Sequence, residues 1–526
     1  MRIHEPLPSN MLIQNESLSR KFITKWAWLY FFVLLSAPIG YIIRIILTGD
    51  LTPGEVGIIF WTISLLGLLW TYSDFWLTES LNYFLPKYII KNDYARVKYL
   101  LLITFTVQII TSTIVSISLY FWASFLANHY FHSPEAKWVI EVLSLFFIGS
   151  HLLNIISTFL SAIQNVKLQK MLDFFRMAVT VLSACIILFS WTWSLIYYTW
   201  IWIIGIYSAL IIGAVMFYHK YYKTYLYIPT HVDPSLRKDL IRYSLGTLFS
   251  SNVAIVIHQV DMQFITYFLW VTDTGIYSIY LSLIGIPFIF LWPIISFLFP
   301  VISEMGWRWD KKKIQSIFTI FSTHLSIIIA WMGAIFMISG KEISGFLFGP
   351  AFLPSWVALY YISPFLIFNI LFQLHFQILW WLWHVRQRII ILAQTLFVSI
   401  VLSLICILGY KYGYLWFPSW SSAASFAVGV SWILLWFLSY RSVREYAIWF
   451  DWKYFLKNIF CICLYLCWFY FLKQSLSVDF WFSGRLIYLP TIWFALFSSF
   501  AIFLILNFGS IREFITIIKK VRSGGL

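Results

Sequence analysis

One carboxylate lies near the middle of an apolar stretch of the chain. Asp261 follows His258 and Gln259 in SSNVAIVIHQVDMQFITYFLW, residues 250–270. A charged side chain at the centre of a membrane helix costs about 2.5–3.5 kcal/mol on insertion scales, and such groups commonly face a wet interior. We therefore predict that Asp261, His258 and Gln259 lie on a path for an ion or a substrate. The alternative is that Asp261 lies close enough to the bilayer surface to be solvated.

Other charged side chains interrupt apolar stretches and belong to the same predicted pathway. Asp74 and Glu79 occur in TYSDFWLTES, and Arg44 occurs in APIGYIIRIIL. Arg44 could instead extend its charge to the headgroups, since long basic side chains do so near helix ends. Three more arginines lie where an anionic headgroup would enter, although membrane orientation alone explains them: Arg176, Arg242 and Arg386.

The composition indicates a membrane protein along its whole length. Of the 526 residues, 61% are hydrophobic and 11% are charged, whereas about 25% are charged in a soluble domain. The 29 Trp and 32 Tyr suit the membrane–water interfaces, where such rings prefer to lie. We predict an all-α polytopic membrane protein without a separate soluble domain.

Apolar stretches of roughly 20 residues, the length that crosses the hydrocarbon, predict about 14 spans. Their approximate bounds are 26–47, 56–82, 99–126, 138–162, 172–192, 195–218, 244–267, 276–303, 315–338, 355–382, 389–410, 421–440, 457–472 and 486–508.

Basic residues predict the orientation of these spans. Of the 36 Lys and Arg, 30 fall on the side of the N-terminus and 6 on the other. Cytoplasmic loops carry the excess of positive charge, so we expect both termini in the cytoplasm and the chain in the cytoplasmic (inner) membrane. The formal charge of +15 then reflects orientation and contact with lipid headgroups of the bilayer, and we expect no nucleic acid partner.

The cysteines do not predict a metal site. Cys461, Cys463 and Cys467 share one apolar stretch that has no nearby histidine or acidic partner, so packing explains them. We expect neither a metal nor a cofactor.

Two segments of the chain resemble one another. GIIFWTISLLG at 57–67 and GIYSIYLSLIG at 275–285 share five positions at an offset of 218, and FLP at 84–86 is echoed by LFP at 298–300. Six spans separate the copies, so both have one orientation, as in transporters built from parallel repeats. We predict an N-lobe (1–220, spans 1–6), a C-lobe (221–440, spans 7–12), and a 441–526 segment with two additional spans and a cytoplasmic tail.

The repeat relates the acid on span 7 to the base on span 1. Asp261 precedes Gly275 by 14 residues and Arg44 precedes Gly57 by 13, so they occupy similar depths in the two halves. We predict that they face one another across a cavity between the lobes, either as a gate or with Asp261 as the carboxylate for a counter-ion.

Three motifs together resemble those of a known family. PGEVGIIFWTISLLGLLWTYSDFWLTESLNYFLP ends at Pro86, the acid at 261 is followed by TGIYSIYLSLIG and LFP, and SGFLFGPAFLPSW spans 344–356. This order resembles the polysaccharide transporter (Wzx-like) branch of the multidrug/oligosaccharidyl-lipid/polysaccharide (MOP) flippase superfamily over residues 25–440. Trp76 and Ala351 stand where the family has a glycine and an acid, so we infer no role for those positions.

The resemblance implies a flippase rather than an enzyme. Its substrate would be a polyprenyl-diphosphate-linked oligosaccharide, moved from the inner to the outer leaflet by alternating access of two lobes. A proton or sodium gradient would drive transport, and the product would supply surface polysaccharide such as O-antigen, with polysaccharide polymerase machinery as a further partner.

Other functions remain as alternatives. A peptidoglycan-precursor flippase, a drug exporter or a twelve-span facilitator would share much of this pattern, although the facilitator's Gly-Asp-Arg cluster is replaced by PKYIIKNDYARVK. A membrane polymerase or ligase is disfavoured because the outer loops are short and no paired carboxylates have a general acid/base spacing. A Walker sequence for direct use of ATP is also absent.

Overall fold

The computed structural model describes residues 15–74, 77–190, 194–227, 234–248, 253–307, 311–381, 385–444, 452–475 and 489–522. Its elements are helices: α1 (Asn15–Asp50), α2 (Pro53–Ser73), α3 (Leu77–Ile90), α4 (Tyr94–His129), α5 (Ala136–Ala162), α6 (Val166–Ser190), α7 (Leu195–Tyr225), α8 (Pro234–Leu248), α9 (Val253–Phe268), α10 (Val271–Trp307), α11 (Lys311–Phe348), η2 (Pro350–Phe352), α12 (Ser355–Ile362), η3 (Ser363–Phe365), α13 (Leu366–Trp381), α14 (Val385–Lys411), α15 (Trp420–Val443), α16 (Trp452–Ser475) and α17 (Leu489–Arg522).

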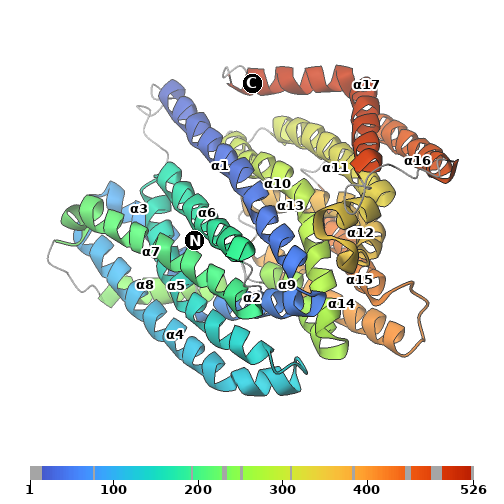
Figure 1. Cartoon of the computed structure of the whole chain (residues 1–526). Helices are drawn as coiled ribbons and strands as arrows, with labels where there is room; N and C mark the ends of the chain where they lie inside the picture. The colour runs from blue at the N-terminus through green and yellow to red at the C-terminus, as the bar shows by residue number, and fades with distance from the viewer. Residues whose placement is uncertain are drawn as a thin grey trace.

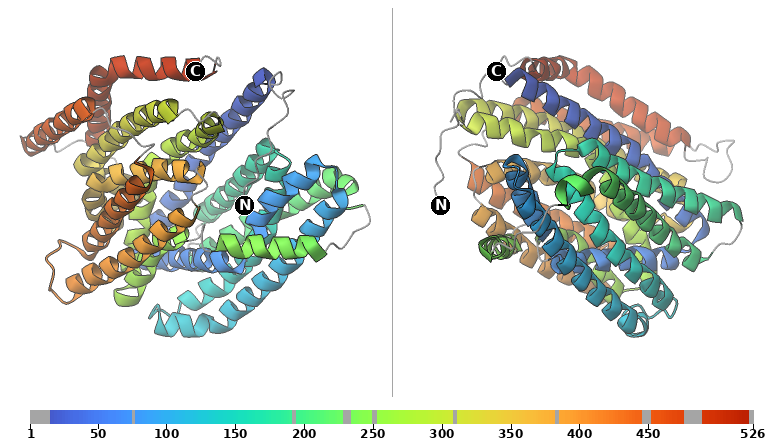
Figure 2. Two further views of the ribbon diagram at one scale, coloured as in Figure 1. Left: turned by 180° about the vertical axis from the view of Figure 1, so that it is seen from behind. Right: turned by 90° about the vertical axis from the view of Figure 1, so that its left-hand side faces the viewer.

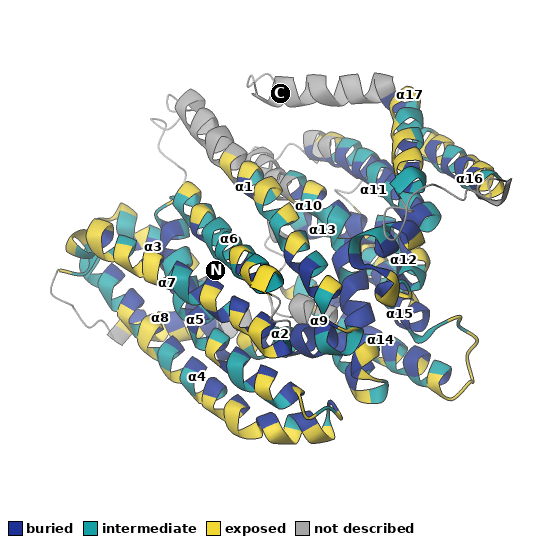
Figure 3. Cartoon of the chain, in the orientation of Figure 1, coloured by how far each residue is buried: buried dark blue, intermediate teal, exposed yellow. Residues whose placement is uncertain are grey.

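The helices form two bundles, as Figure 1 shows. In the N-terminal bundle, α5 packs on α4 and α7, and α6 packs on α1 and α7. In the C-terminal bundle, α14 packs on α9 and α15, and α13 packs on α11 and α15. The residues on the helix faces that meet inside each bundle are buried (Figure 3). Many large apolar side chains elsewhere are exposed, as a lipid-facing surface requires.

The two bundles meet where α2 crosses α10, and two glycines make this crossing close. A Cβ atom on Gly57 would lie 2.1 Å from the carbonyl oxygen of Val271, and one on Gly275 would lie 1.8 Å from that of Pro53. The contacts are reciprocal, since the offset of 218 that relates Gly57 to Gly275 also relates Pro53 to Val271. The internal repeat thus appears in space as an approximate two-fold arrangement. We call the end of the molecule where α2 and α10 begin the closed end.

Thirteen candidate membrane spans occur among the described residues, and thirteen of the fourteen predicted spans agree with them in position apart from their bounds. The seventh predicted span, 244–267, is different. It divides between α8 and α9, which have 15 and 16 residues, so neither reaches the roughly 20 residues that cross a membrane. Gly246 and Thr247, weak helix formers, occupy the last turn of α8.

The second predicted span, 56–82, is also two helices. Helix α2 ends at Ser73 and α3 begins at Leu77, with Asp74 at the junction. The Asp74 carboxylate accepts hydrogen bonds from the backbone N–H of Thr78 (3.3 Å) and from its hydroxyl (2.8 Å). A short acidic side chain that binds the backbone in this way competes with continuous helix formation, which explains why α3 starts anew.

Helix α8 packs on the N-terminal bundle, although its residues fall within the predicted C-lobe (221–440). Leu236 and Leu240 are buried in a core made with α3, α4, α5 and α7. The rings of Tyr243 and Tyr83 stack at 4.7 Å between centroids, and the hydroxyls of Ser80 and Ser244 are 2.7 Å apart. Figure 2 shows α8 (bright green) beside the helices of that bundle.

The last two helices attach to the outside of the C-terminal bundle through α11. Asn458 of α16 accepts hydrogen bonds from the indole of Trp331 (3.4 Å) and from the amide of Asn507 (3.0 Å). Asn458 and Asn507 are buried, so these polar contacts tie α16 and α17 to one another and to α11.

Candidate functional site

Asp261 lies inside the C-terminal bundle. Its side chain is 5% exposed, and its Oδ1 accepts a hydrogen bond of 2.7 Å from the Ser403 hydroxyl of α14. The buried rings of Tyr277 and Tyr280, on α10, lie close enough to interact with its charge. Asp261 therefore does not face lipid, and its polar partner comes from its own bundle.

Two glutamines beside Asp261 connect α9 to the N-terminal bundle. Ser64 of α2 donates a hydrogen bond to the side-chain oxygen of Gln259, and the amide of Gln263 donates one of 3.2 Å to Ser64. Gln259, a predicted pathway residue, is thus at the contact between the bundles. The side chain of His258 lies outside the described residues.

Arg44 lies on the other side of the same contact. Its guanidinium donates to the Ser282 hydroxyl on α10, and its central carbon lies 4.8 Å from the centre of the Phe60 ring. The Tyr41 hydroxyl, one turn earlier, donates to the Ser282 carbonyl at 2.6 Å. Arg44 thus links α1 and α2 to α10.

The expected pairing of Arg44 with Asp261 is not formed in this structure. Arg44 bonds to Ser282 and Asp261 bonds to Ser403, each through its own partner. The repeat predicted similar depths for the two groups but not the direction of each side chain, and Asp261 turns toward α14 instead of α1. A gate made by these two charges is therefore not present in the described conformation.

Asp74 lies inside the N-terminal bundle, between α2 and α3. Besides Thr78, its carboxylate accepts a hydrogen bond from the Gln108 amide of α4. Gln108 was not identified from the sequence, although it is an isolated amide in an apolar stretch, which is a signal that could have found it. The side chain of Glu79 lies outside the described residues.

The three predicted headgroup arginines occupy different environments. Arg242 on α8 and Arg386 at the start of α14 are exposed, whereas Arg176 on α6 is half-buried with the Asp173 charge nearby. They lie on three separate helices, so no common anion site is evident among them.

A tyrosine joins the bundles at the closed end. The Tyr130 hydroxyl, in the loop after α4, donates a hydrogen bond of 2.7 Å to the Gln263 carbonyl of α9. The ring packs 5.0 Å from that of Trp61. Burial raises the pKa of the Tyr130 phenol to about 12, so the phenol keeps its proton and remains a donor at neutral pH.

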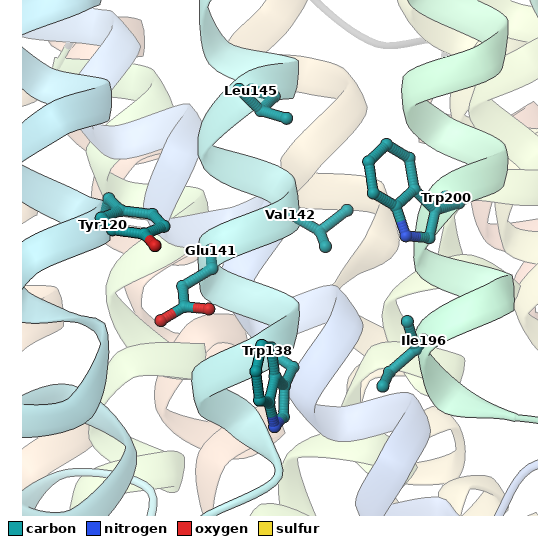
Figure 4. Close-up of a pocket in the computed structure, with 7 residues that line it drawn as sticks. All are labelled: Tyr120, Trp138, Glu141, Val142, Leu145, Ile196 and Trp200. Atoms are coloured by element: carbon teal, nitrogen blue, oxygen red, sulfur yellow. The ribbon is translucent and has the colours of Figure 1, made fainter.

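A groove of about 460 Å³ opens on the outer flank of the N-terminal bundle. Figure 4 shows its aromatic walls, Tyr120, Trp138 and Trp200, with the Glu141 carboxylate between them. The Lys137 ammonium lies 3.9 Å from this carboxylate, so the acid has a counter-charge of its own. Aromatic rings near helix ends suit the membrane interface, and this groove is separate from the contact between the bundles.

The family of the chain follows from a comparison with known proteins. A family described as polysaccharide biosynthesis protein matches residues 22–306, more than half of the chain. The chain belongs to this family. This match agrees with the resemblance of the sequence motifs to the polysaccharide transporter branch of the MOP flippase superfamily. A curated relative, an uncharacterized membrane protein of Methanocaldococcus jannaschii, is 22% identical over 384 residues, covering 67% of this chain and 72% of that protein.

Solved structures share the fold. The lipid II flippase MurJ in an inward closed conformation superposes with a TM-score of 0.65 at 14% identity, covering 92% of this chain and 99% of MurJ. An inward-facing MATE family multidrug resistance transporter of the MOP superfamily gives 0.64 at 10% identity, covering 84% and 96%. An outward-facing form of a MATE family transporter gives 0.55 at 11% identity, covering 85% and 96%. This polysaccharide biosynthesis family member therefore has the all-helical MOP transporter fold, as predicted.

Proposed function

We propose that the protein is a flippase that moves a polyprenyl-diphosphate-linked oligosaccharide from the inner to the outer leaflet by alternating access. The observation that carries the proposal is the close contact between the two bundles, where α2 crosses α10. Membership of the polysaccharide biosynthesis family supports this substrate class.

The contacts at the closed end suit one state of such a cycle. The α2–α10 crossing, the Tyr130 hydrogen bond and the Ser64–glutamine contacts all join the bundles there. The higher TM-scores of the inward closed and inward-facing structures, relative to the outward-facing one, support the same state. Opening requires that these contacts break, so they act as an outer gate.

Asp261 supplies the carboxylate for a counter-ion in this proposal. A buried carboxylate next to a hydroxyl and two phenols can take up a proton or a sodium ion when water reaches it. Because Asp261 is on α9, which also carries Gln259 and Gln263, a change at the acid can be transmitted to the outer gate. Arg44 provides the positive charge near the contact between the bundles for a diphosphate.

Orientation follows from the distribution of basic residues. We place both termini in the cytoplasm and the closed end on the outer side of the cytoplasmic membrane. The N-lobe (1–220) and the C-lobe (221–440) would be the moving bodies, with α8 travelling with the N-lobe because its core contacts are there. Delivery of the product to polysaccharide polymerase machinery would follow on the outer side.

The test is display of a surface glycan in a strain that lacks its own flippase. Asp261→Asn keeps the volume of the side chain and removes its charge, so we expect normal membrane abundance and strongly reduced display. Asp239→Asn is the matched control, because Asp239 is exposed on α8. Full display by Asp261→Asn at equal abundance would contradict the role of this acid.

A growth assay, run beside the display assay, separates the proposed function from its nearest alternative. A chain that restores growth to cells depleted of their lipid II flippase, but does not restore glycan display, would be a peptidoglycan-precursor flippase. The fold similarity to MurJ makes this the comparison to run in parallel.

A further inference from the structure

The groove on the outer flank of the N-terminal bundle lies at the depth of lipid headgroups. Its walls come from α4, α5 and α7, near the end of the molecule where α5 and α7 begin. Trp138 and Glu141 are in the first two turns of α5, and Trp200 is in the second turn of α7. Two turns of helix rise about 11 Å. These side chains therefore reach the interface between water and hydrocarbon, which aromatic rings favour.

The walls of the groove are aromatic and apolar. Trp138, Tyr120 and Trp200 are 55%, 54% and 40% exposed, so these rings are not packed in a protein core. Val142 and Leu145 continue the wall along α5 toward the middle of the membrane. Such a surface suits an acyl chain, but apolar walls are common on the lipid-facing side of this protein and do not select one lipid.

A carboxylate distinguishes this groove from an ordinary apolar surface. The Glu141 side chain is only 12% exposed and stands among the aromatic rings (Figure 4). Its Oε1 lies 3.9 Å from the Lys137 ammonium, the outer limit of an ion pair, and it accepts no hydrogen bond from another described side chain. A carboxylate offers about four lone-pair sites. Because a largely covered charge is costly without hydrogen bonds, a donor that enters the groove would be stabilised there.

The chain itself places an ammonium group at this position. The Lys137 ammonium lies 5.5 Å from the centre of the Trp138 ring, in addition to its contact with Glu141. An aromatic face and a carboxylate both attract an ammonium group. The Lys137 side chain is 41% exposed, and an exposed ion pair adds little stability. A second ammonium can therefore replace it at little cost.

The two charges of this ion pair match a zwitterionic headgroup. When an external ammonium binds Glu141, the displaced Lys137 ammonium is free to pair with a phosphate beside it. An anionic headgroup without an ammonium would instead bring negative charge close to Glu141. A primary ammonium has three N–H donors for the carboxylate, whereas a trimethylammonium group has none. The chemistry therefore favours ethanolamine over choline and glycerol.

We propose that the groove binds one molecule of phosphatidylethanolamine. Its ammonium donates to Glu141 among the rings, its phosphate contacts Lys137, and one acyl chain lies along Val142 and Leu145. The site is separate from the contact between the bundles and from Asp261. It depends neither on the transported substrate nor on the side of the membrane that the closed end faces.

Native mass spectrometry of the purified full-length protein tests this proposal. The protein is delipidated in detergent and titrated with dioleoyl phosphatidylethanolamine, phosphatidylcholine or phosphatidylglycerol. We expect one high-affinity molecule of phosphatidylethanolamine per chain and weaker binding of the other two lipids. Glu141→Gln keeps the shape of the side chain and removes its charge. It should lower the affinity for phosphatidylethanolamine at least about tenfold, as the loss of hydrogen bonds to a charged group does.

The matched control is Glu135→Gln, which removes an exposed acid just before α5 that does not line the groove. It should leave binding unchanged. Equal affinities for the ethanolamine and choline lipids, unchanged binding by Glu141→Gln, or an equal loss in Glu135→Gln would each overturn the proposal.

A second variant covers the case in which Glu141→Gln is not monodisperse on size exclusion. Trp200→Leu removes one aromatic wall at an exposed position and should also weaken binding of phosphatidylethanolamine. Unchanged binding by this variant would then count against the site. Binding is measured without glycan, so a failure here is distinguishable from a failure of the flippase assay.

Discussion

Replacement of Gly57 by alanine tests whether the α2–α10 crossing is the outer gate. The new Cβ atom would lie 2.1 Å from the Val271 carbonyl oxygen, whereas ordinary contacts begin near 3.4 Å, so the helices must separate locally by roughly 1.3 Å. The atom that it meets belongs to the backbone, and no rotamer change can relieve the overlap. Overpacking of this kind costs about 1–3 kcal/mol. This cost destabilises only the state in which α2 and α10 are in close contact, and not the state in which they have separated.

The expected result is a shift in population toward the state with an open outer side. A bias of about 1–3 kcal/mol corresponds to a change of about 5- to 150-fold in the equilibrium between the states. Cysteines at Gly54 and Thr272 report the crossing, because a Cβ on Gly54 lies 3.6 Å from Thr272 Oγ1. The sulfur of a cysteine at position 272 would stand near this oxygen position, so the two cysteines can form a disulfide with little movement. The parent chain would have its five native cysteines replaced.

The control for this experiment lies on the same helix. A Cβ on Gly67 meets nothing within 4 Å, so Gly67→Ala should leave the crosslinked fraction unchanged. Gly57→Ala should lower it markedly under the same oxidation. Equal crosslinking in the parent chain and Gly57→Ala, or an equal loss in Gly67→Ala, would refute the argument from the close approach.

Two further predictions concern contacts outside the crossing. Tyr130→Phe removes the hydrogen bond to the Gln263 carbonyl and should weaken the outer gate by about 0.5–1.5 kcal/mol, seen as faster labelling of a cysteine at Ser64; unchanged labelling would assign the bond no part in the gate. Asn458→Leu removes the acceptor of the buried Trp331 indole and one of the two acceptors of the Asn507 amide, which keeps the Phe503 carbonyl. The melting temperature in detergent should therefore fall, with a cost of about 1–3 kcal/mol. A melting temperature equal to that of the wild type would show that α16 and α17 are held by apolar packing.

Much of the fold could be predicted from the sequence because the membrane leaves few choices. Long apolar stretches in lipid are expected to be helices, since a helix satisfies all of its backbone hydrogen bonds within one segment. The repeat could be predicted because Gly57 and Gly275 lie at equivalent positions of its two copies. Both are glycine because a Cβ atom at either position would overlap the backbone of the other helix. The end of α2 at Ser73 and the end of α8 at Leu248 escaped prediction, because hydropathy averages over a window and does not register a single helix end.

The candidate site was predicted less completely, for a geometric reason. Polar residues in apolar stretches were found, but their partners depend on the direction of each side chain. Asp261 meets Ser403, which is 142 residues away in the sequence, and Arg44 meets Ser282 across 238. Serines are common in membrane helices and give no signal of their own. Gln108 did give one, and its i+4 neighbours on α4 mark the face on which to search.

The position of α8 has a consequence for how the chain is made. The N-terminal bundle buries Leu236 and Leu240 of α8 in its own core, so that bundle is incomplete until residue 248 has left the ribosome. A chain that stops after α7 would expose an apolar face on α3 to water or lipid, whereas one that extends through α8 covers it. During biosynthesis the first bundle can therefore close before α9 is inserted, and the second bundle then assembles against a finished partner.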